Sequence, residues 1–258
     1  MSQSAHAVFH YTGCFDHLAN ILANGFYPSY CKETIHRGTF IEEYAIPMVS
    51  FCDIPLSQVK DHIEKYGPYA IGLSLNWAVQ NHLNPVQYLE SNSALNEGVN
   101  GIFWFLMQDW HEILEDNQFD EFYEKAYKGG LAVLGSIKPY EGLRKRKDGQ
   151  TVLYKFYNER EWRYTPRLTI DHIPEYEDIF WQDCFDDLKK RFPTKPHFNI
   201  LNLNFTTADI KYLIVKTEQE IPSLIEFLRS QPKFYGNKEE FQILLTKILT
   251  HERIENDF

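Results

Sequence analysis

Residues 158–164, with the sequence NEREWRY, are the strongest candidates for chemistry in the chain. In an extended segment Glu159, Glu161 and Arg163 share one face, because side chains alternate along a strand. The two carboxylates then lie about 7 Å apart. Their repulsion raises one pKa unless a cation such as Arg163 compensates. Trp162 on the other face indicates a strand that covers a core and carries a catalytic platform. The structural alternative is an exposed edge strand with alternating charges.

A second candidate lies at His10-Tyr11-Thr12, at the end of a predicted strand. Alternation places His10 and Thr12 on one face and Tyr11 on the other. An imidazole and a hydroxyl on one face, just before a helix, suit a pocket for a polar ligand. The alternative is a histidine that is partly buried for packing reasons.

Residues 47–57, with the sequence PMVSFCDIPLS, form a third candidate. Ser50 and Cys52 share a strand face, and Phe51 points the other way. No GxSxG elbow surrounds Ser50, so the segment does not predict a nucleophile. Asp53 fits equally well as the cap of the next helix.

The only dense basic run is Arg144, Lys145, Arg146 and Lys147. The whole chain has 26 Lys and Arg against 36 Asp and Glu, a net charge of −10. Such a protein contacts nucleic acid only through a local basic patch, and this run is the candidate. A solvated loop is the alternative.

The sequence lacks the motifs of metal sites, of common nucleotide sites and of secreted or membrane proteins. No HExxH spacing, CxxC pair or glycine-rich phosphate loop occurs, so we expect no metal site and no Rossmann or Walker nucleotide site. The four cysteines are expected to be small core residues. Residues 1–9 lack the features of a signal peptide, and no window is apolar enough to span a membrane. We therefore expect a cytoplasmic protein.

The elements that would position these residues follow from hydrophobic patterning. In the first half we expect strands at 7–12, 47–52 and 69–75, helices at 16–25, 53–66 and 76–78, an irregular segment at 28–45, and an extended segment at 84–88. In the second half we expect helical structure at 99–127, 218–230 and 238–251, and strands at 131–138, 151–157, 159–164 and 212–215. No regular βαβ rhythm appears, which favours an α+β fold. We expect one domain over residues 1–258, with a helical insertion near 99–127 and C-terminal helices that complete the core.

Several ordered segments resemble the AbiGi family of bacterial abortive-infection proteins. The resemblance runs from about residue 8 to 230 and is carried by residues 10–12, 25–26, 47–57, 84–86, 138–142 and 159–163. The same skeleton is similar to the ADP-ribosyltransferase superfamily, including DarT-like toxins that modify nucleic acid. This second resemblance implies a split mixed β-sheet core with inserted and flanking helices.

The resemblance also implies roles for individual residues. Glu161 would be the catalytic carboxylate, with Glu159 as its neighbour. The cofactor NAD would be held by His10 at its adenosine ribose, by Tyr11 and Thr12 near its nicotinamide end, and by Ser50 or Phe51 on the middle strand. Tyr66 and Tyr69 are the candidates for the aromatic that stacks on nicotinamide. Arg163 and the run from Arg144 to Lys147 would bind the acceptor.

These roles describe a toxin of a toxin–antitoxin system that transfers ADP-ribose from NAD to RNA or DNA in phage defence. Cleavage of the ribose–nicotinamide bond creates an oxocarbenium-like centre, which a carboxylate stabilises without a metal. A cognate antitoxin protein is the implied partner. The alternatives are a non-enzymatic antitoxin with a degenerate pocket and an NAD glycohydrolase, in which water is the acceptor.

Overall fold

The computed structural model describes residues 5–37, 40–106, 117–145, 149–166, 177–193 and 201–257. The elements up to residue 106 are β1 (Ala7–Thr12), α1 (Phe15–Asn24), β2 (Ser29–Arg37), β3 (Phe40–Cys52), η1 (Leu56–Gln58), α2 (Lys60–Tyr66), β4 (Tyr69–Ser74), α3 (Leu75–Gln80), β5 (Asn84–Pro85), β6 (Gln87–Leu89) and α4 (Ala94–Leu106). Those that follow are α5 (Asn117–Ser136), β7 (Ile137–Pro139), β8 (Gly142–Lys145), β9 (Thr151–Tyr154), η3 (Phe156–Glu159), β10 (Glu161–Tyr164), β11 (Phe180–Trp181), η4 (Gln182–Cys184), α6 (Phe185–Arg191), β12 (Ile210–Val215), η5 (Glu218–Glu220), α7 (Ile221–Ser230), α8 (Pro232–Tyr235), α9 (Lys238–Leu245), β13 (Ile248–Thr250) and α10 (His251–Asp257).

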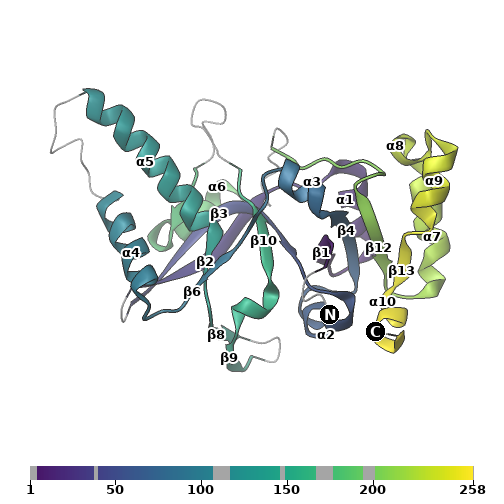
Figure 1. The fold of residues 1–258 in the computed structure, drawn as a ribbon, viewed down its shortest axis with the longest axis horizontal. Helices are drawn as coiled ribbons and strands as arrows, with labels where there is room; N and C mark the ends of the chain where they lie inside the picture. The colour runs from purple at the N-terminus through teal and green to yellow at the C-terminus, as the bar shows by residue number, and fades with distance from the viewer. Residues whose placement is uncertain are drawn as a thin grey trace.

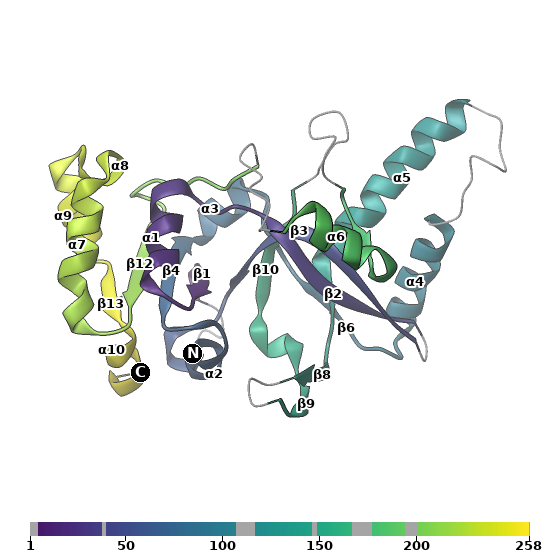
Figure 2. The same ribbon diagram turned by 180° about the vertical axis from the view of Figure 1, so that it is seen from behind.

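A mixed β-sheet forms the centre of the molecule. Its strand order is β13–β12–β4–β1–β3–β10–β5, and β2 and β11 also pair with β3. Most pairs are antiparallel, whereas β12 and β13 run parallel. Helices α4 and α5 lie at one end, and α7, α8 and α9 lie at the other (Figures 1 and 2). The α+β class expected from the sequence is confirmed. Within the described residues no helix is long and apolar enough to span a bilayer.

The sheet is covered by apolar side chains on both faces. Val8 and Ile71 face a large core that includes Leu18 and Leu22 of α1 and Leu228 of α7. The odd-numbered positions of β1 face a second core with α2 and α10, formed by Ala7, Phe9, Tyr11, Cys52, Ile54, Val59, Ile63, Ala70, Ile214 and Ile254. The C-terminal helices therefore complete the core, as expected.

Strand β3 belongs to two parts of the sheet. Its first nine residues pair with β2, and Val49–Cys52 pair with β10. Its only registered pair with β1 is Phe9 with Cys52. Beyond this pair β1 continues against β4, while β3 leaves it. The divergence opens the sheet between these two strands.

Several expected boundaries were wrong. Residues 29–37 and 40–52 form the paired strands β2 and β3, where an irregular segment was expected over 28–45. Residues 131–136 complete helix α5, so only the end of the expected strand at 131–138 is extended. The helical segment expected at 99–127 corresponds to two helices, α4 and α5, and α4 begins earlier, at Ala94. Residues 107–116 lie outside the described residues. Of the cysteines, only Cys52 is buried.

Candidate active site

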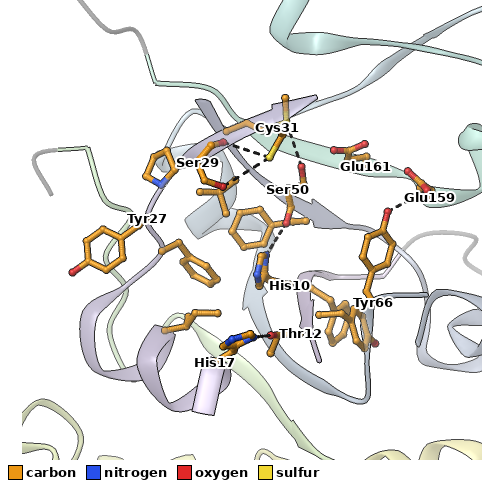
Figure 3. Close-up of a pocket in the computed structure, with 18 of the residues that line it drawn as sticks. His10, Thr12, His17, Tyr27, Ser29, Cys31, Ser50, Tyr66, Glu159 and Glu161 are labelled. Carbon is orange, nitrogen blue, oxygen red and sulfur yellow. Dashed lines mark hydrogen bonds between the residues drawn. The ribbon is translucent and has the colours of Figure 1, made fainter. Parts of the chain in front are cut away.

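The divergence of β1 and β3 opens into a cavity of about 560 Å³. This volume lies within the range of about 300–1,000 Å³ that is typical of small-molecule sites. Eight of the residues singled out in the sequence line it, namely His10, Tyr11, Thr12, Ser50, Phe51, Tyr66, Glu159 and Glu161. Figure 3 shows His10 in the middle of the cavity, with the two glutamates and Tyr66 on one side. Segments about 150 residues apart in sequence therefore meet here.

His10 is held by the neighbouring strand. Its Nδ1 lies 2.8 Å from the carbonyl oxygen of Ser50 (Figure 3). A carbonyl only accepts, so Nδ1 carries the proton and the ring orientation is fixed. The edges of Phe26 and Phe51 pack against the ring. Thr12 bonds His17 of α1 at 3.2 Å. The polar groups on this side are thus arranged before any ligand binds.

Glu161 begins strand β10 and is 6% exposed. Its Oε1 accepts from Nε of Arg163 at 2.8 Å, and its Oε2 accepts from Lys138 at 2.8 Å. The Arg163 contact is bidentate, with a second bond of 3.1 Å to Oε2. Burial alone raises the pKa of Glu161, but Arg163 and Lys138 outweigh it and hold that pKa well below the ordinary value. Glu161 is therefore ionised at neutral pH.

Glu159 also lines the cavity, but it lies on a 3₁₀ helix and not on strand β10. It ends the 3₁₀ helix η3, and Arg160, with a φ of 43°, turns the chain into β10. The expected continuous strand over 159–164 is therefore wrong at Glu159. Its carboxylate accepts from Lys138 at 2.8 Å, from Tyr66 at 3.2 Å and from Lys65. Burial raises the pKa of Glu159, but the two lysines bring it below the ordinary value.

Arg163 lies inside the molecule, on the face shared with Glu161. It is 1% exposed, and besides Glu161 it contacts Glu33 at 2.6 Å and the carbonyl oxygens of Gly135 and Ile137. The expectation that Arg163 contacts the acceptor does not agree with this position. Its role as the cation that compensates the carboxylates is confirmed. Trp162 and Tyr164 point the other way and pack against the large core, as predicted.

The sequence reasoning missed three charged residues around Glu159 and Glu161, which together with these glutamates and Arg163 form the charged wall of the cavity, and it missed one histidine. Lys138 bridges Glu159 and Glu161, and Lys65 reaches Glu159 from α2. Glu33 of β2 lies within 4.0 Å of Lys138, and burial raises its pKa although Arg163 and Lys138 oppose the rise. His62 of α2 also lines the cavity. A local signal existed only for Lys138, in the family-like segment 138–142.

The remaining predicted residues lie apart. Tyr69 packs in the large core and donates to Glu220 at 2.8 Å, and it is not among the residues that line the cavity. Arg144 lies on strand β8 with its guanidinium 4.8 Å from the ring centre of Tyr154. Lys145 ends the same strand, and Arg146 and Lys147 lie outside the described residues. Within the described residues no group of three His, Cys, Asp or Glu could hold a metal ion.

The arrangement combines an oriented imidazole, buried ionised carboxylates and aromatic rings around one cavity. Fixed negative charge in a site of low dielectric stabilises a cationic centre that develops during bond cleavage. Lys65, Lys138 and Arg163 keep Glu159 and Glu161 ionised before a ligand enters. The cavity therefore suits a polar ligand on which positive charge develops next to Glu161.

Comparisons with known proteins identify relatives. Residues 24–216 match the family model described as "Putative abortive phage resistance protein AbiGi, antitoxin". The chain is 31% identical over 255 residues to a protein of Lactococcus lactis subsp. cremoris named "Abortive phage resistance protein AbiGi". That alignment covers 90% of this chain and 99% of the relative. No solved structure is significantly similar to the chain.

Proposed function

This chain belongs to the AbiGi family of abortive phage resistance proteins. Beyond this defence role, we propose that it is an NAD-dependent ADP-ribosyltransferase. The acceptor in this proposal is nucleic acid, RNA or DNA. A cognate partner protein would restrain the activity before infection. The proposal extends the family's defence role to a specific reaction.

One observation carries the proposal. Strands β1, β3 and β10 are successive neighbours in the sheet, and they bring His10, Ser50 and Phe51, and Glu161 to one cavity. The similarity to ADP-ribosyltransferases assigns these positions to NAD binding and catalysis. The split between β1 and β3 also agrees with the split sheet that this similarity implies.

The residues fit NAD as a substrate. The protonated Nδ1 of His10 already donates to the Ser50 carbonyl, which fixes the imidazole in the cavity where the ribose would bind. Glu161 stays ionised beside Arg163 and Lys138, as stabilisation of an oxocarbenium-like ribose requires. Tyr66 supplies an aromatic ring on the glutamate side of the cavity. Nicotinamide leaves as a neutral base, so its departure needs no acid.

The hairpin of β8 and β9 supports nucleic acid as the acceptor. The ring of Tyr154 is contacted by the guanidinium of Arg144, 4.8 Å from the ring centre, and by the ammonium of Lys65, at 4.9 Å. Lys65 in turn bonds Glu159 at the cavity. A basic and aromatic surface thus leads from the hairpin to the carboxylates, and such surfaces bind single strands.

The test is transfer of label from NAD. We expect the purified wild-type protein to label RNA or single-stranded DNA, and Glu161→Gln to lower the rate by at least about 100-fold, because it removes the charge that faces the transition state. Glu226→Gln, at an exposed position of α7, is the matched control and should keep the wild-type rate. Thermal unfolding of both variants separates lost chemistry from lost folding. Unchanged transfer in folded Glu161→Gln would contradict the proposal.

A non-enzymatic antitoxin is the second candidate. The description of the family model names an antitoxin, and the carboxylates are already paired with Lys65, Lys138 and Arg163, as in a structural network. This candidate predicts a stoichiometric complex with a toxin and no binding of NAD. Release of free ADP-ribose without labelled polymer would instead identify an NAD glycohydrolase.

A further inference from the structure

A polar recess lies on the carboxylate side of the cavity, between β1 and α2. Strand β1 places Tyr11 on the face opposite His10, and α2 covers this face with His62 and Tyr66. The ring centres of Tyr11 and His62 are 5.3 Å apart, and those of His62 and Tyr66 are 4.4 Å apart. All three residues line the cavity. The recess is therefore continuous with the site of the proposed reaction.

The hydroxyl of Tyr11 has no hydrogen-bond partner among the described residues. Tyr11 is only 7% exposed. Leaving a buried hydroxyl unpaired costs about 1–3 kcal/mol, so such groups are rare unless a ligand or ordered water completes them. The neighbouring serine, threonine and tyrosine hydroxyls of the cavity, at Ser50, Thr12 and Tyr66, are all hydrogen-bonded.

His62 is a second polar group without a hydrogen-bond partner among the described residues, next to Tyr11. Its ring packs against those of Tyr11 and Tyr66, and among the described residues neither ring nitrogen has a hydrogen-bond partner. Burial lowers the pKa of His62 to about 4, although Glu159 opposes the shift. At neutral pH the imidazole is therefore uncharged and presents one donor and one acceptor nitrogen.

We infer that the recess binds the edge of the acceptor nucleobase and that His62 takes the proton of the attacking nitrogen. A base edge carries a hydrogen-bond donor next to an acceptor, which complements the acceptor nitrogen of His62 and the hydroxyl of Tyr11. The inference rests on the proposed function and assigns the acceptor's place within the same site.

Transfer to the base forms one bond and breaks one bond. The lone pair of the base nitrogen forms a bond to C1′ of the ribose, and the bond from C1′ to nicotinamide breaks. The electron pair of the broken bond stays on the nicotinamide nitrogen and neutralises its positive charge. The proton of the attacking nitrogen moves to His62, which becomes imidazolium and later releases it to solvent.

The charges around His62 shape this step. Glu159 of η3 and Glu161 of β10 favour the imidazolium, whereas Lys65 of α2 and Lys138 of β7 oppose it. Tyr11 and Tyr66 are uncharged, because burial raises the pKa of both hydroxyls. Burial and the two lysines outweigh the carboxylates, so His62 readily passes the accepted proton on to solvent.

The test compares transfer with NAD use in His62→Gln and Tyr11→Phe. Labelled NAD is the donor, and the oligonucleotide pool labelled by wild type is the acceptor. We expect His62→Gln to lower kcat for transfer by about 100- to 10,000-fold, the range of general base catalysis, with the Kd for NAD unchanged. Tyr11→Phe should raise KM for the oligonucleotide about 3- to 10-fold, the effect of one uncharged hydrogen bond. His6→Gln, at an exposed position next to β1, is the matched control.

A structural role predicts a different pattern. Because the Tyr11 hydroxyl is unpaired without ligand, Tyr11→Phe should unfold at or above the wild-type temperature, and a lower unfolding temperature would contradict the inference. A raised KM for NAD with an unchanged KM for the oligonucleotide would assign the recess to the cofactor and overturn it. So would transfer at the wild-type rate in His62→Gln. A wild-type protein that neither binds nor consumes NAD would instead overturn the proposed function, and this inference with it.

Discussion

At the scale of single residues, one lysine, Lys138, contributes charge compensation to all three carboxylates of the charged wall. Lys138 is 2.8 Å from both Glu159 and Glu161 and within 4.0 Å of Glu33, and its side chain is 11% exposed. No water shell can replace this ammonium at such burial. Removing one partner of a buried ion network leaves uncompensated charge, which costs more than the network contributes as a whole.

Lys138→Met tests this dependence. We expect the free energy of unfolding at pH 7 to fall by about 3–5 kcal/mol, because two or three carboxylates then repel one another in a buried space. Urea denaturation measures the change. Lys189→Met, whose side chain on α6 is 72% exposed, is the matched control and should change stability by less than about 0.5 kcal/mol. Equal effects of the two substitutions would refute the electrostatic role of Lys138.

The pH dependence of the same variant follows from the pKa shifts. In the wild type the pKa values of Glu159 and Glu161 are depressed, so their stabilisation is present above the unfolded value of 4.5 and is lost as pH falls through the folded values. Without Lys138 both pKa values rise, and protonation relieves the repulsion. The deficit of Lys138→Met should therefore be largest at pH 7 and shrink toward about pH 4.5.

The sequence could predict half of this network. Glu161 and Arg163 meet because they are two residues apart on one strand, which alternation alone establishes. Glu33 lies 130 residues before Arg163 in sequence, and only the pairing of β2 with β3 and of β3 with β10 brings it there. No local pattern encodes such a contact.

At the scale of elements, the short helix α2 is what completes the recess and the charged wall. It supplies His62, Lys65 and Tyr66, and it ends at Gly67, whose φ is 116°. A Cβ at Gly67 would lie 2.4 Å from the carbonyl oxygen of Thr12 and 2.5 Å from Cα of Gly13. The end of α2 therefore packs directly on the backbone that follows β1.

Gly67→Ala should displace α2. Because both the backbone strain and the clash with a rigid neighbour act at this position, we expect a loss of at least about 1–3 kcal/mol in the free energy of unfolding. Gly149→Ala has a similar φ of 88°, but no atom of the described residues lies within 4 Å of the added Cβ, so it reports strain alone and should cost less. Thermal and urea unfolding of the two variants decide the point. An equal loss in both would show that the contact with β1 contributes nothing.

The sequence predicted those elements whose own hydrophobic periodicity and end signals define them. Strand β1 alternates cleanly between two cores, and α1 has Leu18 and Leu22 on one face and Gly25 at its end. Strand β2 was missed because its sequence SYCKETIHR contains few apolar residues, and its partner β3 imposes the strand. The apolar run after residue 130 suits either a strand or a buried helix, and packing of α5 against α4 favoured the helix.

At the scale of the whole molecule, the net charge of −10 limits how nucleic acid can approach. A surface of this net charge repels a phosphate backbone, so the proposed nucleic acid acceptor would contact the basic hairpin β8–β9 beside the cavity. The C-terminal helices α7, α8 and α9 lie at the far end of the molecule from α4 and α5 (Figure 1), and the hairpin projects separately from both.

The salt dependence of transfer measures the size of this contact. Each neutralised phosphate of a single strand contributes about −0.7 to the slope of log affinity against log salt concentration, so four basic residues allow a slope no steeper than about −3. We expect Arg144→Gln to raise KM for the oligonucleotide, to reduce the magnitude of the slope by about 0.7, and to leave KM for NAD unchanged. Arg229→Gln, at an exposed position of α7, removes the same charge away from the hairpin and should change neither value.

A slope much steeper than −3 in the wild type, or an equal effect of the two substitutions, would mean that nucleic acid contacts the protein through a larger surface than the hairpin. Because transfer by Arg144→Gln at saturating oligonucleotide should match wild type, the same titration separates binding of the strand from the chemistry at Glu161.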